Sequence, residues 1–122
     1  MKLIFNNKLN DLPSENPEGN VEYKFKLIKV TKVKIDKLTS QMLYRFMQGN
    51  GTAYYYLGVM DDGKSIGLNM DEVYITINCI LDCLYELEGR VESIRIYNQG
   101  EEKYCLYVKI KKDKLPNLKI KL

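Results

Sequence analysis

The spacing of hydrophobic and polar positions predicts a strand followed by a helix in the first half of the chain. In residues 21–27, apolar and charged side chains alternate with a period of two, which is typical of a half-buried strand. The expected inward side chains are Val21, Tyr23, Phe25 and Leu27, and the expected outward ones are Glu22, Lys24 and Lys26. From residue 35 to residue 48 the period becomes helical, and the sequence "GNG" at 49–51 ends the helix.

The second half of the chain predicts a hairpin, a helix and two further strands. Residues 53–59 form an aromatic strand, and Asp62-Gly63 predicts a turn into a return strand at "KSIGL", residues 64–68. Asn69 followed by Glu72 is a capping-box pattern, which predicts that a helix begins here and runs to Gly89. Residues 91–98 and 103–112 alternate again and predict the last two strands.

This order of elements predicts an α+β fold. It reads β-α-β-β-α-β-β, a ferredoxin-like βαββαβ unit with an extra C-terminal strand and both helices on one face of a mainly antiparallel sheet. A chain of 122 residues is long enough for one core and too short for two. We expect an extended N-terminal tail over residues 1–20, a single domain over 21–112 and a basic C-terminal tail over 113–122.

Composition argues against catalysis and against a resident cofactor or metal. The chain has no histidine, which is the commonest general base and a common zinc ligand. Cys79 and Cys83 are one helical turn apart, but only Cys105 and carboxylates remain to complete a four-ligand zinc site, so we interpret all three as small buried side chains. The chain starts with no secretory signal, which favours reduced thiols and the cytoplasm. The carboxylates of the second helix and its exit, Asp82, Glu86, Glu88 and Glu92, fit a solvated surface.

Residues 58–65, "GVMDDGKS", match the spacing of a nucleotide-binding P-loop. A working P-loop needs a strand, a glycine loop and a helix that begins near the lysine, so that backbone N–H groups can surround the phosphates. Here "IGLN" follows Lys64 and Ser65, and Asp61 and Asp62 would repel a triphosphate. We therefore interpret the match as accidental and expect no nucleotide at Gly58–Ser65.

Charge is strongly segregated along the chain and favours a polyanionic partner. Residues 59–102 carry ten carboxylates against three basic side chains, whereas the flanking blocks 21–58 and 103–122 are basic. An ordinary solvated surface is the alternative interpretation of the same charges.

The strand patterns place tyrosines and cations together on the face of the sheet that the helices leave uncovered. Tyrosine rings can stack on bases, and lysine or arginine can contact phosphates. We therefore predict an RNA-binding face, extended by the lysine-rich tail "KKDKLPNLKIKL". The predicted RNA-binding residues are Lys24, Lys26, Tyr54, Tyr56, Arg95, Tyr97, Tyr107, Lys109, Lys111, Lys112 and Lys114. A protein interface is the alternative for this face, and a merely solubilising role is the alternative for the tail.

Three stretches resemble the domain ahead of the GTPase module in the GTP-binding protein 1 and 2 family of translational GTPases. They are "EGNVEYKFKL" (18–27), "TSQMLYRFMQGNGTAYYYLGVMDDG" (39–63) and "GL" (67–68). The family's pattern matches Gly19 to Leu27, Gln41 to Gly51 and Tyr55 to Gly63, and Tyr44 stands where the family has tryptophan. The resemblance covers residues 18–112, so GTP hydrolysis is not among its implications.

A stand-alone copy of this domain also resembles a microsporidian dormancy factor found on inactive ribosomes. That resemblance implies a ribosome-binding protein that occupies the tRNA exit site and blocks translation by steric occlusion. We therefore expect the ribosome as the partner, with no membrane contact. The alternative is a protein-interaction module that recruits a translational GTPase.

Overall fold

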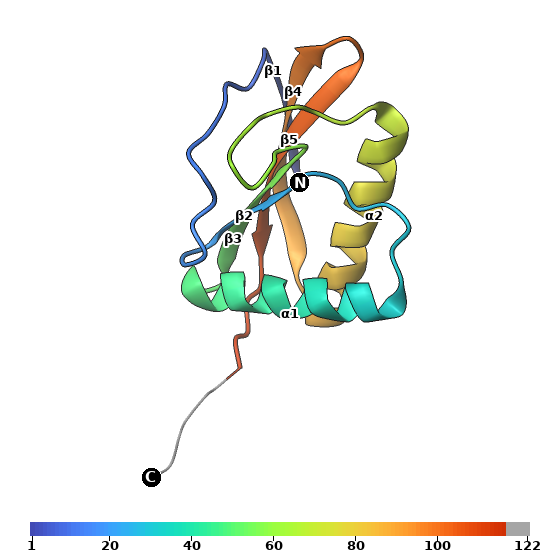
Figure 1. Ribbon diagram of the computed structural model, residues 1–122. Helices are drawn as coiled ribbons and strands as arrows, with labels where there is room; N and C mark the ends of the chain where they lie inside the picture. The colour runs from blue at the N-terminus through green and yellow to red at the C-terminus, as the bar shows by residue number, and fades with distance from the viewer. Residues whose placement is uncertain (117–122) are drawn as a thin grey trace.

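The structure is a computed structural model that describes residues 1–116 (Figure 1). Residues 117–122, the distal part of the predicted basic tail, lie outside the described residues. Seven elements follow one another along the chain: β1 (Lys2–Asn6), β2 (Val21–Lys24), α1 (Lys32–Gln48), β3 (Thr52–Leu57), α2 (Met70–Leu87), β4 (Arg90–Gly100) and β5 (Lys103–Lys111). The predicted α+β class is confirmed.

The five strands form one mixed sheet in the order β1-β4-β5-β3-β2. The β4/β5 and β3/β5 pairs are antiparallel, whereas β1 runs parallel to β4 and β2 runs parallel to β3. The prediction of a mainly antiparallel, ferredoxin-like sheet is therefore corrected. Antiparallel pairing occupies the centre of the sheet, and both edges are parallel.

Both helices pack against the same face of the sheet, which we call the helix face (Figure 1). Met42 and Phe46 of α1 and Ile80 and Leu84 of α2 are buried in a single apolar cluster. They meet the inward side chains of the strands, which are Ala53, Tyr55, Leu57, Ile94, Leu106, Val108 and Ile110. Burying these helical stripes against an alternating sheet removes their apolar area from water, which is the main stabilising contribution to such a layer.

The first twenty residues are not a free tail. Lys2–Asn6 forms the edge strand β1, because it pairs in register with residues 93–97 of β4. Residues 7–20 then run along the side of the sheet away from α2, and their last residues reach α1 before the chain enters β2 (Figure 1). Leu9 and Leu12 from this segment pack against a second, smaller cluster formed by Tyr23, Val59 and Cys105.

The predicted return strand at residues 64–68 does not form. The turn at Asp62-Gly63 is present, and the Gly63 N–H donates to the carbonyl of Met60. Beyond it the chain makes only isolated bridges, from Val59 to Ser65 and from Leu68 to Tyr104. Residues 10–15 supply the pairing that a return strand would have had, since the N–H groups of Leu12 and Glu15 donate to the carbonyls of Gly63 and Asp61.

Within the described residues, neither helix has the length and apolar character needed to cross a membrane.

Candidate nucleic-acid interface

The sheet face opposite the helices, which we call the tyrosine face, carries side chains in rows that cross the strands. Strand register sets these rows, because directly paired residues point to the same side of a sheet. From β1 to β3, one row contains Lys2, Ser93, Lys109 and Tyr54, and the next contains Ile4, Arg95, Tyr107 and Tyr56. The predicted juxtaposition of tyrosines with Arg95, Lys109 and Lys111 is therefore present in the fold.

The tyrosine rings pack on one another. The rings of Tyr54 and Tyr107 are stacked, with centroids 5.4 Å apart and planes at 6° to each other. The ring centroids of Tyr56 and Tyr107 are 4.4 Å apart. A ring face that already packs against another ring is closed to a base, so Tyr107 offers an edge and a hydroxyl rather than a stacking surface. Burial, with smaller contributions from neighbouring tyrosines, raises the pKa of Tyr107 and Tyr56, which keeps both hydroxyls protonated as hydrogen-bond donors.

Four basic side chains surround the tyrosines, and we call Lys2, Arg95, Lys109 and Lys111 the cationic patch. Lys2 and Arg95 are exposed, and Lys109 and Lys111 are partly exposed. Lys111 lies 3.7 Å from a carboxylate oxygen of Glu92. Within residues 1–116, Lys2, Arg95 and Lys109 form no ion pair. Their charge is thus free for an anionic partner.

Residues 7–20 cover the other end of the tyrosine face. Tyr97 is partly buried and packs against the cluster of Tyr23, Val59 and Cys105 beneath this segment. The side chain of Gln99 fixes the segment here, since its amide exchanges hydrogen bonds with the backbone of Leu9 at 2.7 and 3.0 Å. Of the predicted residues on this face, Tyr97 therefore contributes packing more than accessible surface.

Three predicted RNA-binding lysines are not on the tyrosine face. Parallel pairing with β3 puts Tyr23 opposite Tyr56, which reverses the predicted orientation of β2 and turns Lys24 toward α1. Lys24 donates to Gln41, and Lys26 forms a 2.9 Å ion pair with Glu72 of α2. The third, Lys112, donates to the carbonyl of Leu87 at the end of α2. Lys114 is exposed beyond β5, beside Glu88.

Alternation alone could not decide the orientation of β2, because the structure buries both of its faces. Tyr23 is covered by residues 7–20, and its hydroxyl donates to the carbonyl of Pro13. Glu22, which the alternation in residues 21–27 predicted to point outward, is only 6% exposed. It is neutralised by a side chain that the periodicity of α1 did not single out.

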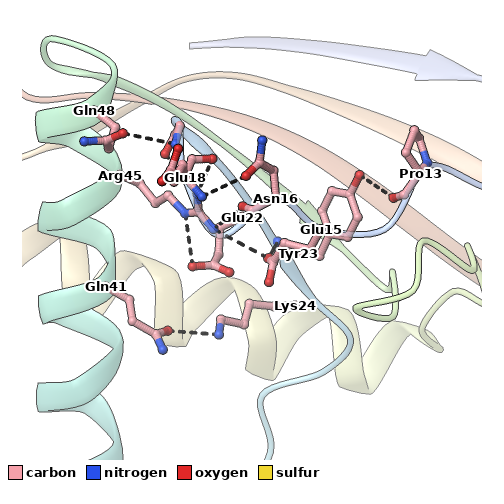
Figure 2. A network of polar contacts seen from close by, with 11 residues as sticks. Pro13, Glu15, Asn16, Glu18, Glu22, Tyr23, Lys24, Gln41, Arg45 and Gln48 are labelled. Atoms are coloured by element: carbon pink, nitrogen blue, oxygen red, sulfur yellow. Dashed lines mark hydrogen bonds and ion pairs between the residues drawn. The ribbon is translucent and has the colours of Figure 1, made fainter.

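That side chain is Arg45, which holds the N-terminal segment to α1 (Figure 2). Arg45 is 3% exposed, and its Nε lies 3.4 Å from Glu22. The remaining guanidinium nitrogens donate to the carbonyls of Asn16, Glu18 and Gly19 at 2.9–3.1 Å. A buried arginine is stable only when its donors are matched in this way. Because these carbonyls belong to a loop, no sequence pattern predicts the hydrogen bonds that Arg45 makes with them.

Glu15 is the titratable member of this network. Its carboxylate accepts from the backbone N–H of Tyr23 and lies 4.0 Å from Arg45. Burial, a hydrogen bond with Glu22 and the charges of Glu22 and Asp61 raise the pKa of Glu15 to about 7, against the lowering effect of the Tyr23 N–H. The carboxyl group therefore titrates near neutral pH.

The P-loop-like stretch is a structural turn in which several N–H groups are already engaged. The N–H of Lys64 donates to Asp62, and the N–H of Ser65 donates to Asp11 at 3.0 Å. The Ser65 hydroxyl donates to the carbonyl of Asn10. Gly63 has a φ of +95°, and a Cβ at this position would lie 1.9 Å from the Leu12 oxygen, so only glycine fits against the N-terminal segment. These contacts explain the glycine and the serine without a nucleotide.

The three cysteines are separate, buried side chains in the described part of the chain. Cys79, Cys83 and Cys105 are free and buried, and burial is the main cause that raises the pKa of each thiol, to about 12 for Cys105. No group of three or more potential metal ligands occurs among the described residues. The polar groups that the tyrosine face itself presents are cations and tyrosine hydroxyls.

The chain is similar in sequence to part of a larger GTP-binding protein. It is 36% identical over 69 residues to GTP-binding protein 2 of Homo sapiens and of Mus musculus, a match that covers 57% of this chain and 12% of theirs. It is also 29% identical over 87 residues to protein R625 of Acanthamoeba polyphaga mimivirus, covering 70% of this chain and 47% of that protein. No protein-family model and no solved structure matches the chain.

These matches support a relation to the GTP-binding protein 1 and 2 family, in agreement with the motif resemblance. The chain spans about an eighth of the length of GTP-binding protein 2, so the matched segment is a small portion of that protein.

Proposed function

We propose that the protein is a ribosome-binding factor without enzymatic activity that acts in the cytoplasm and silences idle ribosomes. In this proposal the tyrosine face lies against ribosomal RNA at a tRNA site, the exit site, and translation is blocked by steric occlusion. The observation that best supports this proposal is the cationic patch. Its Lys2, Arg95 and Lys109 surround stacked tyrosines and have no carboxylate partner among residues 1–116. The relation to GTP-binding protein 2 and the resemblance to a dormancy factor suggest the ribosome as the source of that RNA.

The packing of the tyrosines favours contact with the RNA backbone over base stacking. Because Tyr107 packs against both Tyr54 and Tyr56, inserting a base would require the rings to separate. Hydroxyl donors and cations instead suit phosphate and ribose oxygens, whose positions follow RNA shape rather than sequence. Binding that depends on shape and charge suits a factor that must fit one folded RNA surface.

Salt dependence of ribosome binding tests the proposal. Each phosphate neutralised by a basic side chain contributes about 0.7 to 0.9 to the slope of log affinity against log salt. The double variant Arg95→Gln/Lys109→Gln should therefore reduce the magnitude of that slope by about 1.4 to 1.8 and lower the fraction of protein that co-sediments with purified ribosomes. Added deacylated tRNA should compete with the wild-type protein if a tRNA site is occupied.

A matched control separates a local surface from net charge. Lys34→Gln/Lys37→Gln removes the same charge from exposed positions of α1, on the opposite side of the molecule. Ribosome binding by this variant should keep the wild-type salt slope. Equal losses in the two double variants would defeat the proposal, since binding would then follow overall charge.

The alternative, a protein-interaction module that recruits a translational GTPase, is favoured by a different surface, the outward side of α2, where Tyr74 and Tyr85 are largely exposed. Pull-down before and after RNase treatment distinguishes the two, because an RNA-mediated association with ribosomes is lost on digestion.

A further inference from the structure

Helix α2 exposes a stripe of large apolar side chains that the core does not use. The stripe consists of Met70, Tyr74, Leu81 and Tyr85, which are 62%, 72%, 44% and 85% exposed. At 3.6 residues per turn, these positions fall within an arc of about 60° on the helix surface. Scattered apolar residues are ordinary on a protein surface, but an aligned set along four turns is typical of a contact face.

The charge beside the stripe is entirely negative along the helix. Residues 70–87 contain no lysine or arginine, and Asp71, Asp82 and Glu86 are exposed on the outward side of α2. At its N-terminal end, Glu102 shares a shallow pocket of about 430 Å³ with Met70 and Asp71. The last turn of α2 contains no basic residue, although a cation there would interact favourably with the helix dipole. The apolar stripe is thus bordered by acids.

Edge strand β1 extends apolar surface on the same side of the sheet as α2. Leu3 and Phe5 are paired with Ile94 and Ile96, whose side chains point to the helix face. They are nevertheless 49% and 72% exposed, because the two helices leave this edge uncovered. The exposed apolar surface of the helix layer therefore includes both the stripe and this edge.

We propose that the outward side of α2 is a docking site for a basic amphipathic helix of a partner protein. Apolar anchors at helical spacing would pack on the stripe, and lysines or arginines beside them would face Asp71, Asp82 and Glu86. The stripe spans fifteen residue steps, about 22 Å, which matches a partner helix of about four turns.

The negative charge of α2 argues against two other binding partners for the stripe. An anionic lipid surface would be repelled by a helix that carries only acids. Symmetric pairing of α2 with a second copy of itself would place the same carboxylates against one another. A basic helix gains from both the apolar stripe and its acidic border. This docking site lies on the helix side of the molecule, so it does not depend on RNA binding by the tyrosine face.

Synthetic helices test the proposal directly. The probe is a labelled amphipathic peptide of about five turns built from leucine and lysine, compared with leucine/glutamine and leucine/glutamate versions of the same pattern. Fluorescence anisotropy should give saturable binding of the lysine peptide to the wild-type protein, weaker binding of the neutral peptide and none of the acidic one. Equal binding of the lysine and glutamate peptides would overturn the proposal.

Surface variants locate the binding. Leu81→Ala/Tyr85→Ala should weaken binding of the lysine peptide by about tenfold or more, because truncating large anchors of an interface has effects of that size. Asp82→Asn/Glu86→Gln should weaken it less and flatten its salt dependence. Val33→Ala/Ile66→Ala, which removes exposed apolar side chains elsewhere, should bind like the wild type.

Two further readouts keep the test decisive. Alanine favours helix, so thermal melting by circular dichroism should show that the variants remain folded. Sedimentation velocity checks the competing occupant: self-association of the wild type that disappears in Leu81→Ala/Tyr85→Ala would mean that a second copy covers the stripe, and it would overturn the proposal. Unchanged binding of the lysine peptide by Leu81→Ala/Tyr85→Ala would also overturn the proposal. Ribosome co-sedimentation need not change in any of these variants, so failure here is separable from failure of RNA binding.

Discussion

Arg45 and Glu22 form a buried ion pair whose main effect is to position the backbone around it. Removing two charges from water costs several kcal/mol, and mutual attraction offsets this only when the remaining donors also find partners. Arg45 meets that condition by donating to three carbonyls of residues 16–19. The pair therefore fixes the path of the N-terminal segment as much as it joins β2 to α1.

Glu15 makes the stability of this arrangement depend on pH. Its pKa is raised from an ordinary value near 4.5 to about 7 in the folded protein, mainly by burial and by Glu22. Between these values the folded state holds a proton that the unfolded state has released. The free energy of unfolding should therefore decrease as pH rises from about 4.5 to 7, and it should be insensitive to this group above that range.

Glu15→Gln should remove this part of the pH dependence. The glutamine side chain stays neutral and keeps an oxygen to accept from the Tyr23 N–H. Urea unfolding of both proteins at pH 5 and pH 8 should give a variant that gains stability relative to the wild type at the higher pH.

Glu18→Gln, in the same segment but exposed, provides the control and should follow the wild-type pH curve. Parallel curves for wild type and Glu15→Gln would contradict the assignment of a raised pKa to Glu15.

Helix α2 begins at the capping box that its sequence predicted. Asn69 accepts from the N–H of Glu72 at 2.9 Å, and Glu72 accepts from the N–H of Asn69 at 3.1 Å, so two otherwise unpaired donors are satisfied. Glu72 also binds Lys26, which lowers its pKa and ties the start of α2 to the segment after β2.

Asn69→Ala should lower the free energy of unfolding by about 1 kcal/mol, which is the usual cost of losing an N-cap side chain. Chemical denaturation with an unchanged m-value would measure it. Asn78→Ala, at an exposed position inside the same helix, should be neutral or slightly stabilising because alanine favours helix. An equal loss in both variants would mean that the cap contributes nothing specific.

Local patterns predicted the helices, the central strands and the presence of β2, but neither β1 nor the orientation of β2. α1 and α2 carry apolar stripes and caps within their own sequences, so both were predicted with small errors at their ends. β1 was missed because its partner, β4, lies about ninety residues further along the chain, and five residues of "KLIFN" carry too little pattern alone. The orientation of β2 was wrong because it depends on parallel pairing with β3 and on contacts with Arg45 and residues 7–20, which alternation within β2 does not reveal.

The whole molecule has two chemically opposite sides. The tyrosine face is cationic, and the outward side of α2 is acidic and apolar. In the electrostatic field of an RNA surface such a molecule would orient with the tyrosine face toward the RNA. Helix α2 would then point away from the RNA and stay accessible to a protein. Strand alternation predicted that the tyrosines lie together with Arg95, Lys109 and Lys111. Alternation did not predict Lys2, which joins them only through β1, or the exposed stripe of α2.

The turn at residues 58–65 should bind no nucleotide, despite its P-loop spacing. A triphosphate would have to displace the Asp11 and Asp62 carboxylates from the N–H groups of Ser65 and Lys64 and would then lie beside those negative charges. α2 cannot help, because its first N–H groups begin at Met70 and are capped by Asn69. Equilibrium dialysis with labelled GTP and Mg²⁺ should give no saturable binding, and Lys64→Ala should be indistinguishable from the wild type. Saturable binding that Lys64→Ala abolishes would instead require residues 10–15 to leave the turn, and would contradict the role assigned here to the N-terminal segment.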